Sequence, residues 1–124
     1  MYLHEELTNR VIGAAIEVHR HLGPGLLESA YEQCLCHELA LQGIPFQRQA
    51  PLPVFYKGIS LDCAYQMDVL VDDKVILELK SVERFAPIHE AQLLTYLKVS
   101  GKRVGLLINF NVAVLKDGIK RMVL

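Results

Sequence analysis

Two stretches near the start of the chain carry apolar residues at the spacing of an amphipathic helix. In residues 5–22 the apolar positions form one stripe (Leu7, Val11, Ala14, Ala15, Val18 and Leu22). Gly23-Pro24-Gly25 ends this pattern, because glycine can adopt positive φ and proline cannot continue a helix. Residues 27–42 resume the helical spacing up to Gly43, a suitable C-terminal cap. The pattern predicts two helices joined by a turn.

The pattern changes to shorter apolar runs after the second helix. Residues 46–54 contain two prolines, which favours an edge strand because proline has no N–H to donate to a neighbour. A longer strand is expected over residues 61–71, followed by turn-forming residues at 72–74. Residues 75–80 are nearly continuously apolar, which is typical of a strand covered on both faces.

The last third of the chain adds one helix and further strands. Helical spacing covers residues 88–99, and residues 104–110 form an apolar strand. Residues 112–115 and 119–123 flank Asp117-Gly118, a dipeptide that favours a tight hairpin turn. The order is helix, helix, three strands, helix, strand and terminal hairpin, which predicts an α/β fold.

Composition and charge narrow the class of protein. The chain has 124 residues, 52% of them hydrophobic, and lacks repeats or linkers, so we expect a single domain over 1–124. A net charge of -1 gives no general attraction to nucleic acid or membranes, so any nucleic-acid contact needs a local basic patch. Cys34, Cys36 and Cys63 lack the spacing of a metal site, and we interpret them as buried or half-buried thiols in a reducing compartment. Acidic residues near the start, and no apolar run of about 20 residues, predict a cytoplasmic protein without membrane association.

Glu78 and Lys80 are charged residues within the apolar run at 75–80. Because they are two apart in a strand, both side chains emerge on one face. Burying a charge is costly unless the charge is paired or bound to a metal. These two residues alone are consistent with either a structural ion pair or a functional site.

Asp68 adds a second acid in the preceding apolar strand. If residues 72–74 form a three-residue loop, Val71 pairs with Val75 and Asp68 falls opposite Glu78 on the same face. A two-residue loop would instead place Asp68 on the other face. Neighbouring carboxylates repel unless a cation or a proton lies between them, and carboxylates with water and phosphate are ligands that Mg²⁺ prefers. The pair and the adjacent lysine therefore predict a divalent-metal site at which the lysine orients or activates a nucleophile.

These residues carry a resemblance to a known family. The pattern Asp68-x9-Glu78-x-Lys80 resembles the core of the PD-(D/E)XK nuclease superfamily. More closely, Gly25-Leu-Leu-Glu28-Ser-Ala-Tyr31 is similar to the GxxExxY motif of a bacterial family in that superfamily. Further matching segments cover most of the chain (Gly13–His19, Leu22–Gly25, Val75–Lys80 and Leu106–Phe110). Met67 stands where the superfamily name expects proline, at a position that is often degenerate.

The resemblance implies both a fold and an activity. The fold is an αβββαβ nuclease-like core, a mixed central sheet flanked by helices, here with an extra N-terminal helix and a C-terminal hairpin. The activity is hydrolysis of nucleic-acid phosphodiester bonds with Mg²⁺ or Mn²⁺, and DNA is favoured over RNA as the substrate. Because a small, nearly neutral domain offers little surface to a duplex, action as a homodimer or beside a partner protein is consistent with this expectation.

The resemblance also implies a set of site residues. Gln92-Leu-Leu-Thr-Tyr96 resembles the QxxxY element of RecB-type nucleases, and the i, i+4 spacing places both ends on one helix face. Without that resemblance they would be a surface amide and a half-buried tyrosine. Glu28 resembles a first-helix acid near the metal, although a glutamate at a helix start also complements the helix dipole. The implied catalytic set is Asp68, Glu78, Lys80, Gln92, Tyr96 and Glu28, with Asp68, Glu78 and Glu28 on the metal and Tyr31 bracing the site.

Two other classes of function stay open at this point. One is a nuclease-fold module that binds nucleic acid or protein without cleaving. The other is a structural protein whose charged residues form ion pairs. The sequence does not distinguish DNA from RNA, single from double strands, or cutting at ends from internal cutting.

Overall fold

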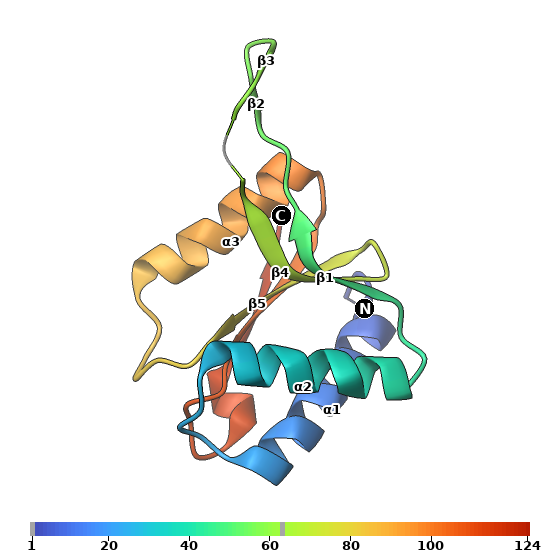
Figure 1. Ribbon diagram of the computed structural model, residues 1–124, viewed down its shortest axis with the longest axis vertical. Helices are drawn as coiled ribbons and strands as arrows, with labels where there is room; N and C mark the ends of the chain where they lie inside the picture. The colour runs from blue at the N-terminus through green and yellow to red at the C-terminus, as the bar shows by residue number, and fades with distance from the viewer. Residues whose placement is uncertain (1, 63) are drawn as a thin grey trace.

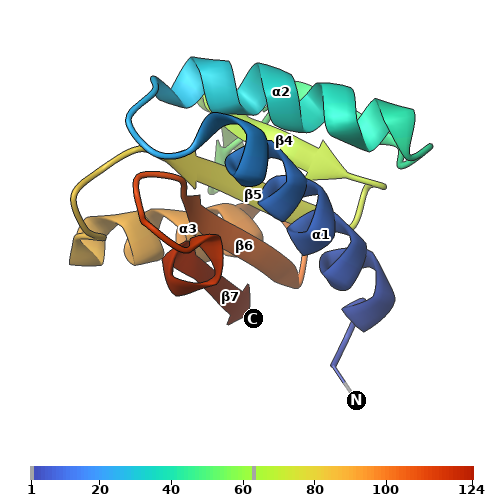
Figure 2. The same cartoon turned by 90° about the horizontal axis from the view of Figure 1, so that it is seen from below.

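The computed structural model describes residues 2–62 and 64–124, and it places a five-stranded sheet between helices (Figure 1). The helices are α1 (Glu5–Leu22), α2 (Glu28–Leu41), α3 (Pro87–Ser100) and a short 3-10 helix, η1 (Leu115–Gly118). The strands are β1 (Phe46–Pro51), β2 (Phe55–Tyr56), β3 (Ile59–Ser60), β4 (Gln66–Val71), β5 (Val75–Lys80), β6 (Val104–Asn109) and β7 (Ile119–Val123). Helices α1 and α2 cover one face of the sheet and α3 the other (Figure 2). The α/β fold expected from the sequence is confirmed.

The three long helices match the predicted ones closely. Helix α1 has the predicted bounds and ends at Gly23, whose φ of 68° lets its N–H reach the His19 carbonyl at 2.8 Å. Helix α2 is one residue shorter at each end than predicted, and α3 one residue longer. Within residues 2–62 and 64–124, no helix has the length and apolar character needed to cross a membrane.

The sheet has the strand order β1-β4-β5-β6-β7, in which β5 and β6 are parallel and the other neighbours antiparallel. Strand β1 lies at an edge, as its prolines predict. Val71 pairs with Val75, so the predicted three-residue loop is confirmed. Asp72 and Asp73 in that loop adopt left-handed φ angles of 49° and 56°.

Strand β5 contributes to two cores, one on each face of the sheet. Val75, Leu77 and Leu79 pack with α1 and α2. Ile76, on the opposite face, packs with Leu93 and other residues of α3. The strand period of two therefore turns the even-numbered residues of β5 toward α3.

Residues 61–71 form a shorter strand than predicted. Strand β4 begins only at Gln66, and residues 55–60 instead form the β2–β3 hairpin, which extends beyond the sheet (Figure 1). Lys57 and Gly58 make its two-residue turn with φ angles of 45° and 88°. Positive φ at both turn residues suits the twist of a tight hairpin.

The predicted terminal hairpin is wrong. Residues 112–114 are not a strand, Asp117 and Gly118 belong to η1, and β7 pairs antiparallel with β6. A Cβ on Gly118 would meet the Asn109 carbonyl oxygen at 2.2 Å, so close packing and not a hairpin turn requires glycine there. Strand β7 pairs with β6, which would otherwise be an edge strand of the sheet.

The two described cysteines lie on α2, with Cys36 buried and Cys34 half-buried as expected. Burial, followed by the negative charge of Glu32, raises the pKa of the Cys36 thiol to about 11. Cys36 is therefore an unreactive thiol at neutral pH. Cys63 lies outside the described residues.

Candidate active site

The side chains of Asp68 and Glu78 meet where β4 and β5 stop pairing. The main-chain register of the two strands runs only from Val71–Val75 to Val69–Leu77. Beyond it, Glu78 Oε2 accepts the Asp68 N–H at 2.9 Å, and Asp68 Oδ2 accepts the Leu79 N–H at 2.8 Å. Each carboxylate is thus held by the main chain of the other strand.

Both acids are withdrawn from water, and this changes their protonation. Glu78 is 4% exposed. Burial, and then the negative charge of Asp68, raises the pKa of Glu78 to about 8. Burial also raises the pKa of Asp68, while its hydrogen bond from the Leu79 N–H opposes that shift. The fold therefore brings together two carboxyls that are costly to ionise side by side.

Lys80 lies beside the two acids without pairing to them. It is half-buried at the end of β5, and its positive charge lowers the pKa values of both Asp68 and Glu78. Among the described residues, Lys80 has no carboxylate oxygen within 4.0 Å. The structural Glu78–Lys80 ion pair considered from the sequence is therefore not formed.

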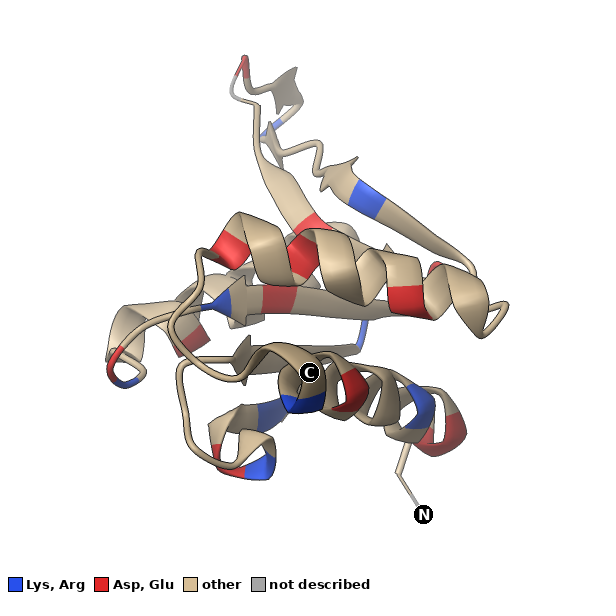
Figure 3. Ribbon diagram, turned by 60° about the horizontal axis from the view of Figure 1, so that its bottom comes forward, with Lys and Arg blue, Asp and Glu red and all other residues tan. Residues whose placement is uncertain are grey.

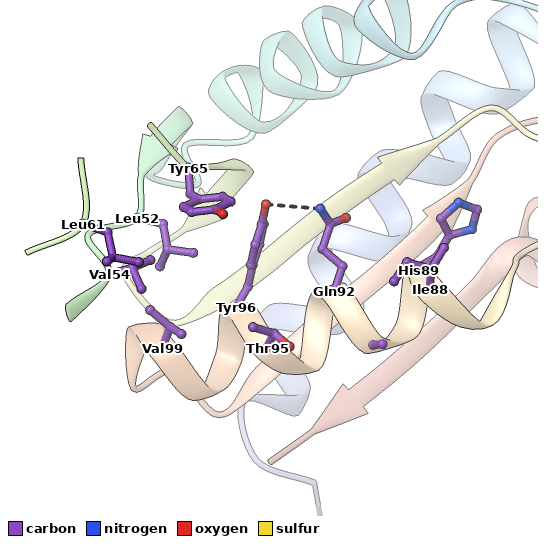
Figure 4. Close-up of a pocket in the computed structure, with 11 residues that line it drawn as sticks. Leu52, Val54, Leu61, Tyr65, Ile88, His89, Gln92, Thr95, Tyr96 and Val99 are labelled. Carbon is purple, nitrogen blue, oxygen red and sulfur yellow. Dashed lines mark hydrogen bonds between the residues drawn. The ribbon is translucent and has the colours of Figure 1, made fainter. Parts of the chain in front are cut away.

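Helix α3 brings Gln92 and Tyr96 to the face of the sheet that carries Glu78. Gln92 Nε2 donates to the Tyr96 hydroxyl at 3.3 Å (Figure 4). Tyr96 is 8% exposed, and burial followed by the charges of Glu78 and Asp68 raises its pKa. The tyrosine therefore stays a neutral phenol beside the acid pair, able to donate a hydrogen bond.

Glu28 approaches the acid pair from the other side of the sheet. It is the first residue of α2, and its Oε2 accepts the Ser81 N–H at 3.4 Å. Ser81 Oγ donates to the Leu26 carbonyl at 2.7 Å. These contacts tie the loop before Glu28 to the end of β5, and the charge of Glu28 contributes to the raised pKa of Asp68.

Tyr31 fixes the turn that leads into α2. Its hydroxyl donates to the Gly23 carbonyl at 2.5 Å and accepts the Leu26 N–H at 3.1 Å. Its buried ring stacks on Phe110 with centroids 4.4 Å apart. These contacts hold the segment that leads to Glu28.

A further acidic residue near Asp68, Glu32, was not predicted from the sequence. Glu32 is 6% exposed, and its carboxylate accepts Arg48 Nε at 2.6 Å and Gln49 Nε2 at 2.8 Å. With Glu28 and Asp68, these side chains line a hollow of about 330 Å³. Figure 3 shows the acidic positions of α2, β4 and β5 close together. The sequence does contain a signal for Glu32. Its i, i+4 spacing from Glu28 puts both acids on one helix face.

Gln49 has a backbone conformation that is unusual within a strand. It lies between the Arg48–Val69 and Ala50–Met67 pairs, opposite Asp68, and has a φ of 53°. Non-glycine residues with positive φ are uncommon and often occur at functional sites. Asp68 is therefore flanked by irregular pairing toward both β1 and β5.

Comparison with protein families agrees with this arrangement. A family model described as the PD-(D/E)XK nuclease superfamily matches residues 5–122. The chain belongs to this nuclease superfamily. Searches of curated proteins and of solved structures give no match. The five-stranded mixed sheet between helices is consistent with a PD-(D/E)XK nuclease fold.

PD-(D/E)XK nucleases usually use divalent metal ions, and the donor set here suits one. In the described part of the chain, Asp68 Oδ1 and Glu78 Oε1 accept no hydrogen bond, which leaves one oxygen of each acid free. Two repelling carboxylates with raised pKa values are stabilised when a divalent cation binds between them. The side chains are not, however, gathered as a ready metal cage, since residues 2–62 and 64–124 contain no group of three or more His, Cys, Asp or Glu placed to hold a metal.

Proposed function

We propose that this PD-(D/E)XK protein is a Mg²⁺- or Mn²⁺-dependent nuclease that hydrolyses phosphodiester bonds of nucleic acid. The observation that carries the proposal is the reciprocal bonding of Asp68 and Glu78 between separated strands, with Lys80 beside them. Structural ion pairing does not explain a buried and a half-buried acid that are unpaired and have raised pKa values. A cation site does, because metal binding removes their mutual repulsion.

Each side chain has a proposed role in this reaction. Asp68 and Glu78 would hold the metal, assisted by Glu28. The metal would polarise the phosphodiester and lower the pKa of a bound water. Lys80 positions the attacking water and offsets the negative charge that develops on the phosphate.

Gln92 and Tyr96 orient the groups around Lys80. The neutral Tyr96 phenol donates to a phosphate oxygen or to the attacking water, and the Gln92 amide fixes the phenol through their 3.3 Å hydrogen bond. This is the role implied by likeness to the QxxxY element of RecB-type nucleases.

We further infer membership of the GxxExxY group within the superfamily. The motif residues act together in this chain: Gly25 has a φ of 103°, which favours glycine, and Glu28 and Tyr31 hold the adjoining segments by hydrogen bonds. All three residues therefore serve one purpose, which is to fix the start of α2 against the end of β5.

We propose DNA, in preference to RNA, as the substrate. We also expect that a dimer or a partner protein enlarges the surface that contacts it. The net charge of -1 supports this second point, because one small neutral domain attracts a duplex weakly. Light scattering with and without oligonucleotide measures the oligomeric state.

Metal binding is the first test. Calorimetry in metal-stripped buffer should detect Mn²⁺ binding to the wild type and none to the variant that combines Asp68→Ala and Glu78→Ala. Asp73→Asn is the matched control, because this exposed loop carboxylate lies outside the site. Mn²⁺ binding that survives in the double variant would contradict the proposed ligands.

Cleavage is the second test. Wild-type protein with Mg²⁺ or Mn²⁺ should cut labelled DNA, and Lys80→Met should reduce the rate at least about 100-fold, as the loss of one charge-stabilising group does elsewhere. RNA and duplex forms of the same sequence define the substrate. Metal binding without cleavage of any of these substrates would favour the nuclease-fold binding module instead.

A further inference from the structure

A pocket of about 420 Å³ lies between α3 and the segments that flank the β2–β3 hairpin. Leu52, Leu61 and Tyr65 form one side, and Tyr96 and Val99 of α3 form the other (Figure 4). Its volume falls within the range of small-ligand sites, about 300–1,000 Å³, and its walls are largely apolar as such sites are.

The polar groups of this pocket are few. Gln92, Thr95 and His89 line it with an amide, a hydroxyl and an imidazole, whose Nδ1 accepts the Ala86 N–H at 3.0 Å. No Asp, Glu, Lys or Arg is among its described lining residues. Such a lining does not suit a phosphate or a charged side chain. It suits a flat, neutral, partly polar group that stacks on tyrosine rings and forms hydrogen bonds at its edge.

Two residues of α3 link the pocket to the acid site. Tyr96 and Gln92 line the pocket and are hydrogen-bonded to each other. Tyr96 also packs in one buried cluster with Met67 of β4 and Ile76 of β5, the two strands that carry Asp68 and Glu78. A base in the pocket and a phosphate at Asp68 and Glu78 can therefore belong to one nucleic-acid strand.

We propose that this pocket binds an unpaired nucleobase next to the bond that is cut, so that the substrate is a single strand or an unpaired region. The inference rests on the proposed nuclease function. A base within a duplex is stacked and paired, and its edges and faces are not available to Tyr65, Gln92 and Thr95. Stacking on aromatic side chains tolerates any base, so this pocket selects strandedness more than sequence.

Filling the pocket tests the proposal. Thr95→Phe places a ring in it from α3, whereas Leu94→Phe adds a ring to the same helix at a position that does not line it. Fluorescence anisotropy in metal-stripped buffer would follow a labelled single-stranded DNA and the matching duplex. Thr95→Phe should weaken single-strand binding about tenfold or more and leave duplex binding unchanged, and Leu94→Phe should change neither.

A second pair of variants keeps the test independent of how well α3 tolerates a ring. Tyr65 is 44% exposed, so Tyr65→Ala should leave the fold intact. This variant should lose about as much affinity for single-stranded DNA as Thr95→Phe does. Tyr65→Phe should retain it, and Phe55→Ala, which removes an exposed ring outside the pocket, should have no effect. An oligonucleotide made of abasic nucleotides should bind wild type and Thr95→Phe equally.

The outcomes separate this inference from the nuclease proposal. If wild type cleaves DNA, but Thr95→Phe and Leu94→Phe bind and cleave single strands alike, the base pocket is wrong and the nuclease stands. If single-strand binding falls in Thr95→Phe and no metal supports cleavage, the base pocket stands and the nuclease proposal is wrong. Wild-type protein that binds no oligonucleotide, or duplex as tightly as single strand, overturns the base pocket and leaves an apolar protein segment as its occupant.

Discussion

The Asp68 N–H donates to the Glu78 carboxylate at 2.9 Å, across the point where β4 and β5 separate. Asp68 in turn accepts the Leu79 N–H at 2.8 Å. These bonds satisfy the main chain while holding the half-buried Asp68 next to the buried Glu78. Because the folded state favours a proton on this pair of acids, the free energy of unfolding should depend on pH.

The first prediction concerns pH and stability without metal. The folded pKa of Glu78 is about 8, above its ordinary value of 4.5, so the folded protein binds the proton more tightly than the unfolded chain. The free energy of unfolding should fall as pH rises from 4.5 to 8, by roughly 4 kcal/mol. Urea unfolding across this range would measure it. Glu78→Gln should remove most of the dependence, and Glu83→Gln, at an exposed position, should retain it.

The second prediction concerns the exchange of a proton for a metal ion. Because the Glu78 carboxyl must ionise before it can bind a cation, Mn²⁺ affinity should rise with pH up to about 8. Calorimetry at pH 7 in two buffers of different ionisation enthalpy should detect release of about one proton per metal. Affinity that is constant between pH 6 and pH 8 would contradict a role for Glu78 as a ligand.

The third prediction concerns the brace at Tyr31. Tyr31→Phe removes the hydrogen bonds with Gly23 and Leu26 but keeps the ring that stacks on Phe110. Leaving these buried groups unpaired should lower the free energy of unfolding by about 1–3 kcal/mol in urea. Tyr56→Phe is the control, since Tyr56 is 59% exposed. A null result at Tyr31 would show that the turn before Glu28 is held by other contacts.

The sequence predicted the acid pair because that prediction depends only on local rules. The helix and strand periods give the elements, and the parity of the loop at 72–74 decides which face Asp68 occupies relative to Glu78. The observed Val71–Val75 register confirms the three-residue loop. The positions of Gln92 and Tyr96 on one helix face followed from the same kind of spacing.

Other features depend on packing between distant segments and could not be obtained in this way. The contact of Glu32 with Arg48 requires α2 to lie over β1, which no local period specifies. Gly118 is needed for its close approach to the Asn109 carbonyl, whereas the Asp-Gly dipeptide alone suggested a hairpin turn. In both cases the sequence marks the residue, but its role depends on a residue distant in the sequence: Arg48 for Glu32 and Asn109 for Gly118.

The last prediction concerns the ion pair of Arg48 and Glu32 beside the acid site. Glu32 is 6% exposed and near Asp68, and the Arg48 guanidinium, 2.6 Å from its carboxylate, offsets its negative charge. Arg48→Met should lower the free energy of unfolding by about 2 kcal/mol or more, because it leaves a buried carboxylate with only the neutral Gln49 amide as a partner. Glu32→Gln should cost less, since Arg48 is partly exposed to water, and adding Glu32→Gln to Arg48→Met should recover part of the loss.

The exposed pair of Lys120 and Glu90, also 2.6 Å apart, is the matched control for Arg48. Lys120→Met should cost no more than about 1 kcal/mol, since surface ion pairs contribute little. Urea unfolding of the four variants gives the comparison directly. Equal losses for Arg48→Met and Lys120→Met would mean that Glu32 tolerates its position without Arg48, and that the acids on α2 are better solvated than their burial indicates. A larger loss for Arg48→Met would establish that Arg48 balances the concentration of negative charge around Asp68.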